Sequence, residues 1–179
     1  MQFNSRDDII QLTPLWQGER FADGRPRVSD DILRRMADVT MEEAWAVLRG
    51  HGYHHSFEGN WHVINPQGVR LVGRAVTGVF VPHRPDLHDH LMALGHEQEG
   101  RIGAMNSWVI ETLVEDDVIV IDLFGKVVNG TFSGANLSTA IARRTKRGQV
   151  IYGGVRDAEQ ILEIADLVTY CKGIDPTAI

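Results

Sequence analysis

The first third of the chain contains stretches in which a hydroxyl residue precedes acidic and then apolar residues. Ser29 precedes two aspartates, so it can cap a short helix whose first turn carries the negative charge that the helix dipole favours. Thr40 is followed three residues later by Glu43, which is the pattern of a capping box. The apolar residues that follow recur at helical spacing, and they are Met41, Ala44, Trp45 and Leu48. The pattern predicts a helix that begins after Thr40 and ends at Gly50.

From Trp61 onward, runs rich in β-branched residues alternate with helical patterns. The predicted strands are 63–64, 71–81, 118–121, 149–152 and 167–170, and the predicted helices are 86–96, 107–113, 133–147 and 157–165. We expect Gly153 and Gly154 to end the strand at 149–152. This alternation favours the α/β class with a mixed sheet over an all-helical bundle.

The chain shows no internal repeat and no interdomain linker, so we expect one domain. Residues 1–28 mix proline, glycine and isolated aromatic residues, which is typical of an arm. We therefore expect residues 1–60 to form an N-terminal arm and helices, and residues 61–179 to form the core.

Composition and charge narrow the classes of function. The net charge is −6, and the 15 arginines and three lysines are spread thinly, so we expect no nucleic-acid partner. No apolar run is long enough to cross a bilayer, and Asp7 and Asp8 stand where a signal peptide would carry bases. We therefore expect a cytoplasmic protein with no membrane partner. The single cysteine, Cys171, cannot form an intrachain disulfide, and its apolar neighbours predict a core position.

The densest pattern of candidate functional residues runs from Asp122 to Asp157. A predicted strand ends in Asp122, a glycine-rich loop and a helix beginning near Asn136 follow, and the next strand leads into Arg156 and Asp157. A helix N-terminus facing a strand end offers free backbone N–H groups to a carboxylate. Arg156 can clamp an anion, and Asp157 offers a hard oxygen ligand to Mg²⁺ or Mn²⁺. The alternative interpretation is a local salt bridge at a helix start, where acidic residues are common.

This region resembles the signature region of the RraA-like superfamily, which groups 4-hydroxy-4-methyl-2-oxoglutarate aldolases with the regulator of ribonuclease activity A. The resemblance is carried by residues 129–140 (NGTFSGANLSTA) and 150–157 (VIYGGVRD). The aldolases have a glycine about twenty residues before an Arg-Asp pair, and here 21 residues separate Gly134 from Arg156. The similarity extends over about 71–175, and the Arg-Asp block is its most specific part.

The resemblance implies a layered α/β/β sandwich of the swivelling-domain type that assembles as a homotrimer or a dimer of trimers. It implies a lyase, an aldolase or decarboxylase that cleaves a short 2-oxo acid such as 4-hydroxy-4-methyl-2-oxoglutarate or oxaloacetate to give pyruvate. By position, Asp157 would bind the Mg²⁺ or Mn²⁺, and Arg156 would hold substrate oxygens. The backbone amides of Gly134, Ala135, Asn136 and Leu137 would hold the substrate carboxylate. The metal would stabilise the enolate of pyruvate.

Two departures from the family pattern keep a second function open. Tyr152 stands where the aldolases often have aspartate, and this resembles the ribonuclease regulators. Those regulators tend to lack the acid at the position of Asp157, so its presence favours the metal site. The family also continues with a strand pair and an acidic segment, so the resemblance implies a catalytic core at 61–179 without its C-terminal strands and leaves the acid–base partner unassigned. The alternative is a non-catalytic, protein-binding regulator.

The eight histidines offer a weaker candidate for a metal site. His88 and His90 would share a face on a strand, but the predicted helix over 86–96 separates their side chains. A further cluster of aromatic, acidic and imidazole side chains at 54–62 could line a pocket, and loop packing is the alternative.

Overall fold

The structure is a computed structural model that describes residues 5–64 and 68–177. The chain divides into two compact units, Met1–Ser56 and Phe57–Ile179. The boundary expected from the sequence lies at residue 60, and Glu58 and Gly59 accept hydrogen bonds from the Lys172 ammonium in the second unit.

The first unit contains three helices, α1 (Arg6–Leu12), α2 (Asp30–Met36) and α3 (Met41–Gly50). The predicted caps of α2 and α3 are confirmed: the Ser29 hydroxyl accepts from Ile32 N–H, and Thr40 and Glu43 form a complete capping box. Helix α1 was not predicted within the arm at 1–28. It forms because the Ser5 hydroxyl caps it and two aspartates lie in its first turn.

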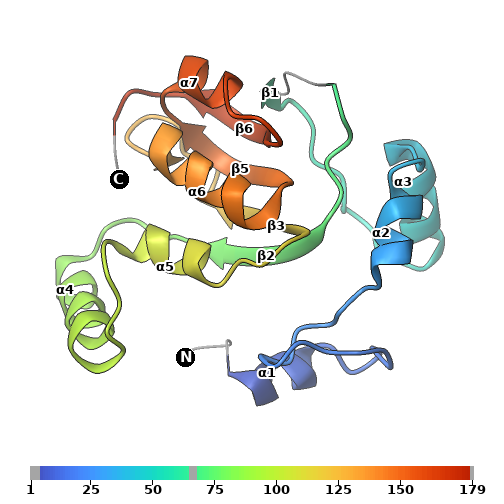
Figure 1. The fold of residues 1–179 in the computed structure, drawn as a ribbon, viewed down its shortest axis with the longest axis horizontal. Helices are drawn as coiled ribbons and strands as arrows, with labels where there is room; N and C mark the ends of the chain where they lie inside the picture. Colours follow the sequence, from blue (N-terminus) through green and yellow to red (C-terminus); the bar gives the residue numbers. More distant parts are fainter. Residues whose placement is uncertain (1–4, 65–67, 178–179) are drawn as a thin grey trace. The chain divides into compact units, whose positions relative to one another are not determined.

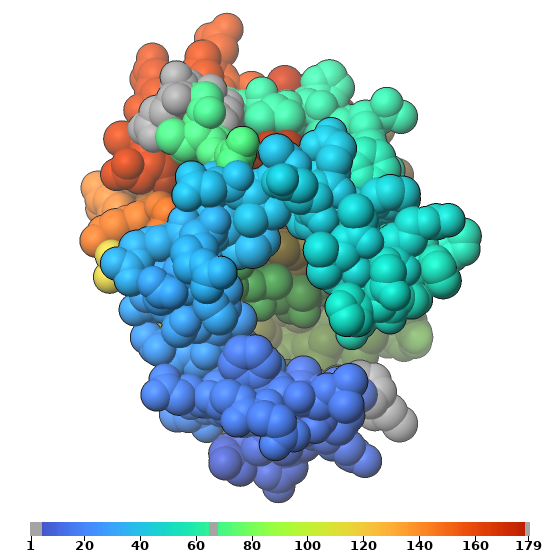
Figure 2. Space-filling view, turned by 90° about the vertical axis from the view of Figure 1, so that its right-hand side faces the viewer, coloured from blue at the N-terminus to red at the C-terminus, as the bar shows by residue number. Residues whose placement is uncertain are grey.

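The residues after α1 fold back instead of extending as a simple arm. The Arg20 guanidinium donates hydrogen bonds to the carbonyls of Thr13, Trp16 and Gly24, which draws these turns together. In the space-filling view, the dark-blue residues of this segment form one compact group (Figure 2).

The second unit is a mixed α/β fold, as predicted. Its elements are β1 (His62–Ile64), β2 (Arg74–Val79), α4 (Pro85–Ala93), the π-helix η1 (Leu94–Gln98), α5 (Met105–Glu111), β3 (Asp117–Asp122), β4 (Thr131–Ser133), α6 (Ala135–Thr145), β5 (Gly148–Val155), α7 (Ala158–Leu162) and β6 (Val168–Ile174). The sheet order is β1-β6-β5-β3-β2, and β4 pairs with β5 beyond the end of β3. The pairings are parallel except that of β1 with β6, so the sheet is mixed.

The core lies between one face of this sheet and helices α5, α6 and α7 (Figure 1). Alternate strand residues point into it because side chains alternate across a strand. The fully buried members include Ile119, Ile121, Ile151 and Cys171 from the strands and Ile141 and Ile161 from the helices. The opposite face of the sheet carries the side chains of Thr77, Val120, Val150 and Tyr152, which are only partly buried or exposed. In the described part of the second unit, helices α5, α6 and α7 form one layer against one sheet.

The strand β5 corrects one prediction. It does not end at Gly153-Gly154 but continues to Val155, because β4 pairs with it there through Thr131 and Gly154. The two glycines are required by close packing: a Cβ on Gly153 would lie 2.5 Å from Leu123 Cδ1, and one on Gly154 would lie 3.0 Å from the Val127 carbonyl oxygen. Strand β4 itself was not predicted, and the predicted helix at 133–147 begins later because Ser133 belongs to β4.

The last strand also differs from the prediction, because β6 runs on to Ile174 instead of ending near Tyr170. Its extension pairs with β5 at Gly154–Gly173 and Val155–Ile174. In the parts of the chain that the structure describes, every helix is too short or too polar to span a lipid bilayer.

Cys171 is fully buried in β6, as predicted, and burial raises the pKa of its thiol above the usual value. Because only the thiolate reacts readily, we expect the native protein to resist alkylation near pH 8, whereas unfolded protein reacts within minutes. Mass spectrometry of iodoacetamide-treated samples, with and without denaturant, would measure this. Rapid labelling of the native protein would contradict the buried position.

Candidate active site

The parallel pairing of β4 with β5 brings the start of α6 beside the end of β5. Ser133 pairs with Val155, and the N–H of Arg156 donates to the Ser133 carbonyl at 3.0 Å. Helix α6 begins two residues after Ser133, so its N-terminus lies next to Arg156 and Asp157. The structure thus brings together the two parts of the sequence that the site prediction combined.

Asp157 faces the first turn of α6. Its Oδ2 accepts a hydrogen bond from the backbone N–H of Ala135 at 3.0 Å. The carboxylate therefore satisfies one of the N–H groups that a helix start leaves without an intrahelical partner. Asp157 itself has a left-handed backbone, with φ 57° and ψ 42°, which turns the chain from β5 into α7. Its side chain is 41% exposed, so the rest of the carboxylate can be reached from solvent.

Gly134 makes this approach possible. A Cβ at this position would lie 2.3 Å from Asp157 Oδ2 and 2.7 Å from Arg156 Nε, distances that real contacts do not show. Its backbone is extended, with φ −113°, so the requirement for glycine comes from space and not from conformation. The glycine that the sequence analysis singled out therefore touches both members of the Arg-Asp pair.

Arg156 lies over the same helix start. Its Nε is 3.6 Å from Asp157 Oδ2, and its side chain is 36% exposed. The local ion pair that the sequence analysis considered as an alternative is therefore present. At this exposure such a pair contributes little to stability. The guanidinium keeps donors available for a bound anion.

The N-terminus of α6 has further N–H groups for an anion. Its cap residue is Gly134, which has no side chain to accept them, and the N–H of Ala135 is taken by Asp157. The N–H groups of Asn136 and Leu137 lie in the first turn, where no carbonyl one turn earlier can accept them. An anion that approaches Arg156 meets these amides and the positive end of the helix dipole.

The protein side chains at this site could supply a divalent metal with one carboxylate ligand, that of Asp157. Among residues 5–64 and 68–177 there is no group of three or more His, Cys, Asp or Glu side chains able to hold a metal ion. Asp157 is a single exposed carboxylate with one oxygen engaged by Ala135. Mg²⁺ is commonly held by one or two carboxylates, with water and substrate oxygens completing its shell, and Asp157 fits that kind of site.

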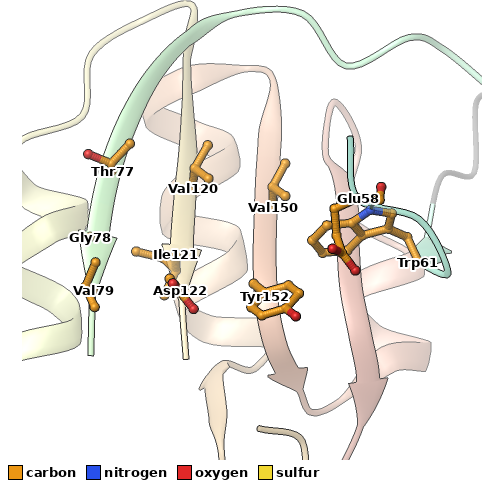
Figure 3. A pocket seen from close by; sticks show the side chains of 10 residues that line it. All are labelled: Glu58, Trp61, Thr77, Gly78, Val79, Val120, Ile121, Asp122, Val150 and Tyr152. Carbon is orange, nitrogen blue, oxygen red and sulfur yellow. Dashed lines mark hydrogen bonds between the residues drawn. The ribbon is translucent and has the colours of Figure 1, made fainter. Parts of the chain in front are cut away.

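Asp122 lies elsewhere. It lines an open groove on the second face of the sheet, with a volume of about 440 Å³, together with Thr77, Val79, Val120, Val150 and Tyr152 from the strands and Glu58 and Trp61 beside β1 (Figure 3). Its Oδ1 accepts from the N–H of Phe124 at 2.7 Å. The sequence placed Asp122 in the same functional stretch as Arg156 and Asp157, but neither of these two residues lines this groove.

Tyr152 also faces this groove and not the Arg-Asp pair. Its ring meets Trp61 edge to face, with the centroids 6.0 Å apart, and the Lys172 ammonium lies 4.5 Å from the Trp61 ring centroid. The cluster at 54–62 that the sequence analysis considered thus contributes Glu58 and Trp61 to a groove. The alternation of β5 residues could have placed Tyr152 and Val150 on one face, but it could not have shown that Glu58 and Trp61, which precede β1, lie against them.

The histidines near β2 are arranged around the start of α4. His88 lies on this helix, as predicted, and its ring is 4.9 Å from the His83 ring. Its Nδ1 lies 3.2 Å from Asp89 Oδ1.

Comparison with known proteins shows the family and the fold of the chain. The family model described as RraA-like, Aldolase/RraA, matches residues 26–178. The crystal structure of Streptomyces coelicolor RraAS2, an unusual member of the RNase ES inhibitor RraA family, is 25% identical with a TM-score of 0.65, over 84% of this chain and 67% of that one. No curated protein matched the sequence.

Two more distant structures share the fold. The RNA-processing inhibitor RraA from Thermus thermophilis is 16% identical with a TM-score of 0.51, over 74% of this chain and 68% of its own. A structure described as novel cellulases from microbes associated with the gut ecosystem is 19% identical with a TM-score of 0.65, over 99% and 70% of the two chains. On the family match over most of its length, the chain belongs to the RraA-like family, which includes both aldolases and non-catalytic ribonuclease inhibitors.

Proposed function

We propose that the protein is a divalent-metal-dependent lyase, an aldolase or decarboxylase that cleaves a C–C bond of a short 2-oxo acid to give pyruvate. Its substrate would be 4-hydroxy-4-methyl-2-oxoglutarate, oxaloacetate or a close relative. The observation that carries this proposal is the meeting of Arg156 and Asp157 at the glycine-capped N-terminus of α6.

Each group at this site has a role that suits a dicarboxylic 2-oxo acid. Arg156 would bind substrate oxygens through its guanidinium, and the N–H groups of Asn136 and Leu137 would bind a carboxylate. Asp157 would hold Mg²⁺ or Mn²⁺, which supplies a positive charge that favours the enolate of pyruvate over the intact substrate. Gly134 and Ala135 would act by position, since Gly134 provides the space and the N–H of Ala135 orients Asp157.

The wider setting of this activity is also a proposal. We place the protein in the cytoplasm, as a homotrimer or dimer of trimers, with a small-molecule substrate and no nucleic-acid or membrane partner. The acidic net charge of −6 supports the absence of a nucleic-acid partner, because phosphate backbones bind basic surfaces.

A non-catalytic regulator that binds another protein is the second candidate. It is favoured by the groove on the open sheet face, where Trp61, Tyr152 and Val150 form an apolar, partly exposed surface. Aromatic side chains of this kind are enriched in protein interfaces. Two similar structures are a member of an RNase ES inhibitor family and an RNA-processing inhibitor. Asp157 argues for the lyase, because a binding surface has no need of a carboxylate held at a helix start.

The first prediction concerns the metal. Pyruvate release from oxaloacetate and from 4-hydroxy-4-methyl-2-oxoglutarate, followed in a coupled assay, should require Mg²⁺ or Mn²⁺ and stop when EDTA is added. Excess metal should restore the rate. No release with any metal, from folded protein, would move the assignment to the regulator.

The second prediction concerns Asp157→Asn. Asparagine keeps an oxygen for the N–H of Ala135 and tolerates a left-handed backbone, but it removes the charge that would hold the metal. We expect kcat/KM to fall by more than about a hundredfold and the free energy of unfolding to fall by less than about 1 kcal/mol. The matched control is Glu159→Gln, an exposed acid in the first turn of α7, which should leave both quantities near the wild-type values.

The third prediction concerns Gly134→Ala. The added methyl group would lie 2.3 Å from Asp157 Oδ2, too close for both atoms to stay, so we expect the carboxylate to move away from the N–H of Ala135. We expect turnover to fall at least about tenfold while the fold persists, because the displaced atoms belong to side chains. Gly50→Ala is the control, since a Cβ there would meet no atom within 4 Å. Equal turnover in wild type and Gly134→Ala would show that Gly134 has no role in the active site.

A further inference from the structure

A closed group of polar side chains is buried beneath the start of α6. Gln149 of β5, Thr169 of β6 and Ser138 of α6 are fully buried, and Ser133 of β4 is 1% exposed. Four polar side chains from four elements therefore meet where water does not reach. Polar groups in such a place are costly unless each one is hydrogen-bonded.

Three of these side chains form a ring of hydrogen bonds. Gln149 Nε2 donates to Ser138 Oγ at 3.0 Å, Ser138 Oγ donates to Ser133 Oγ at 3.4 Å, and Ser133 Oγ donates to Gln149 Oε1 at 3.0 Å. The second N–H of the amide donates to Thr169 Oγ1 at 2.9 Å, outside the ring. Each of the two serine hydroxyls in the ring donates once and accepts once. Gln149 can close the ring because an amide is both a donor and an acceptor.

The ring holds the candidate active site from both sides. Ser133 directly precedes Gly134, and its carbonyl accepts the N–H of Arg156 at 3.0 Å. Ser138 lies in the first turns of α6, and its N–H donates to the Gly134 carbonyl at 3.0 Å. The segment between these two serines contains Gly134, which leaves room for the Asp157 carboxylate. It also contains Asn136 and Leu137, whose amides would face a bound carboxylate. Its ends are thus fixed to one buried amide.

We propose that Gln149 is a positioning residue of the active site, which sets the height and tilt of the α6 N-terminus relative to Arg156 and Asp157. The effect of Gln149 on catalysis rests on the proposed function. Its effect on the position of the helix start does not, because that position is a property of the fold. A helix start that shifts by a fraction of an ångström changes the bond between Ala135 N–H and Asp157 Oδ2, and charge-stabilising groups act only when held in place.

The test compares two variants that each remove buried hydrogen bonds of the same amide. Gln149→Met has a similar shape but can neither donate nor accept, so it opens the ring. Thr169→Val removes the bond outside the ring and is the matched control. The readout is amide hydrogen exchange at Ala135 and Arg156, with the N–H of Ile151 in the middle of β5 as the reference for global stability.

In Gln149→Met we expect exchange at Ala135 and Arg156 to be at least about tenfold faster, after correction by the Ile151 reference. In Thr169→Val, exchange at both amides should follow the reference. If wild-type protein turns over a 2-oxo acid, Gln149→Met should lower kcat more than it changes KM, because the binding groups are present but misplaced.

The inference would be overturned if exchange at Ala135 and Arg156 rose no more in Gln149→Met than in Thr169→Val. Failure of the proposed function looks different. In that case the wild-type protein shows no turnover, while the exchange difference between the two variants persists.

Discussion

Arg156 donates its backbone N–H to the carbonyl of Ser133, and this bond joins the end of β5 to the last residue of β4. The start of α6 follows β4 after Gly134, so the helix N-terminus is placed by the same contact. Asp157 can then reach the N–H of Ala135, and Gly134 leaves room for it. Without this pairing the Arg-Asp pair would lie at an ordinary strand end, with no helix dipole and no free amides beside it. The geometry of the site therefore depends on how β4 pairs with β5.

Local signals in the sequence predicted a large part of the fold. The caps at Ser29 and Thr40 act within four residues, so their sequence pattern is sufficient. The alternation of β-branched runs and helical patterns predicted the α/β class, and the apolar run at 118–121 predicted β3. The glycine and the Arg-Asp pair were identified through their resemblance to a family pattern, and the structure brings them into contact. The catalytic roles of these residues are a proposal.

Other features depend on partners far away in the chain. Strand β4 has three residues and forms by pairing with the end of β5, so its partner lies outside 131–133 and no pattern within that range could predict it. Glycine pairs usually end strands, but here Leu123 and Val127 crowd Gly153 and Gly154 inside the sheet. Asp122 was included in the candidate functional stretch because it ends the strand before the glycine-rich loop, and Tyr152 was noted as a departure from the family pattern. They lie on the open face because adjacent parallel strands place paired residues side by side, as Asp122 and Tyr152 are.

The left-handed backbone of Asp157 limits which side chains evolution can place at this position, whatever the reaction. Glycine, asparagine and aspartate adopt that conformation at low cost, whereas β-branched and bulky residues do not. A relative without metal chemistry would therefore still carry one of these few residues at the equivalent position. Within an alignment, retention of a small polar residue there reports on the turn, and only the choice of aspartate over asparagine or glycine reports on a charge that the protein uses.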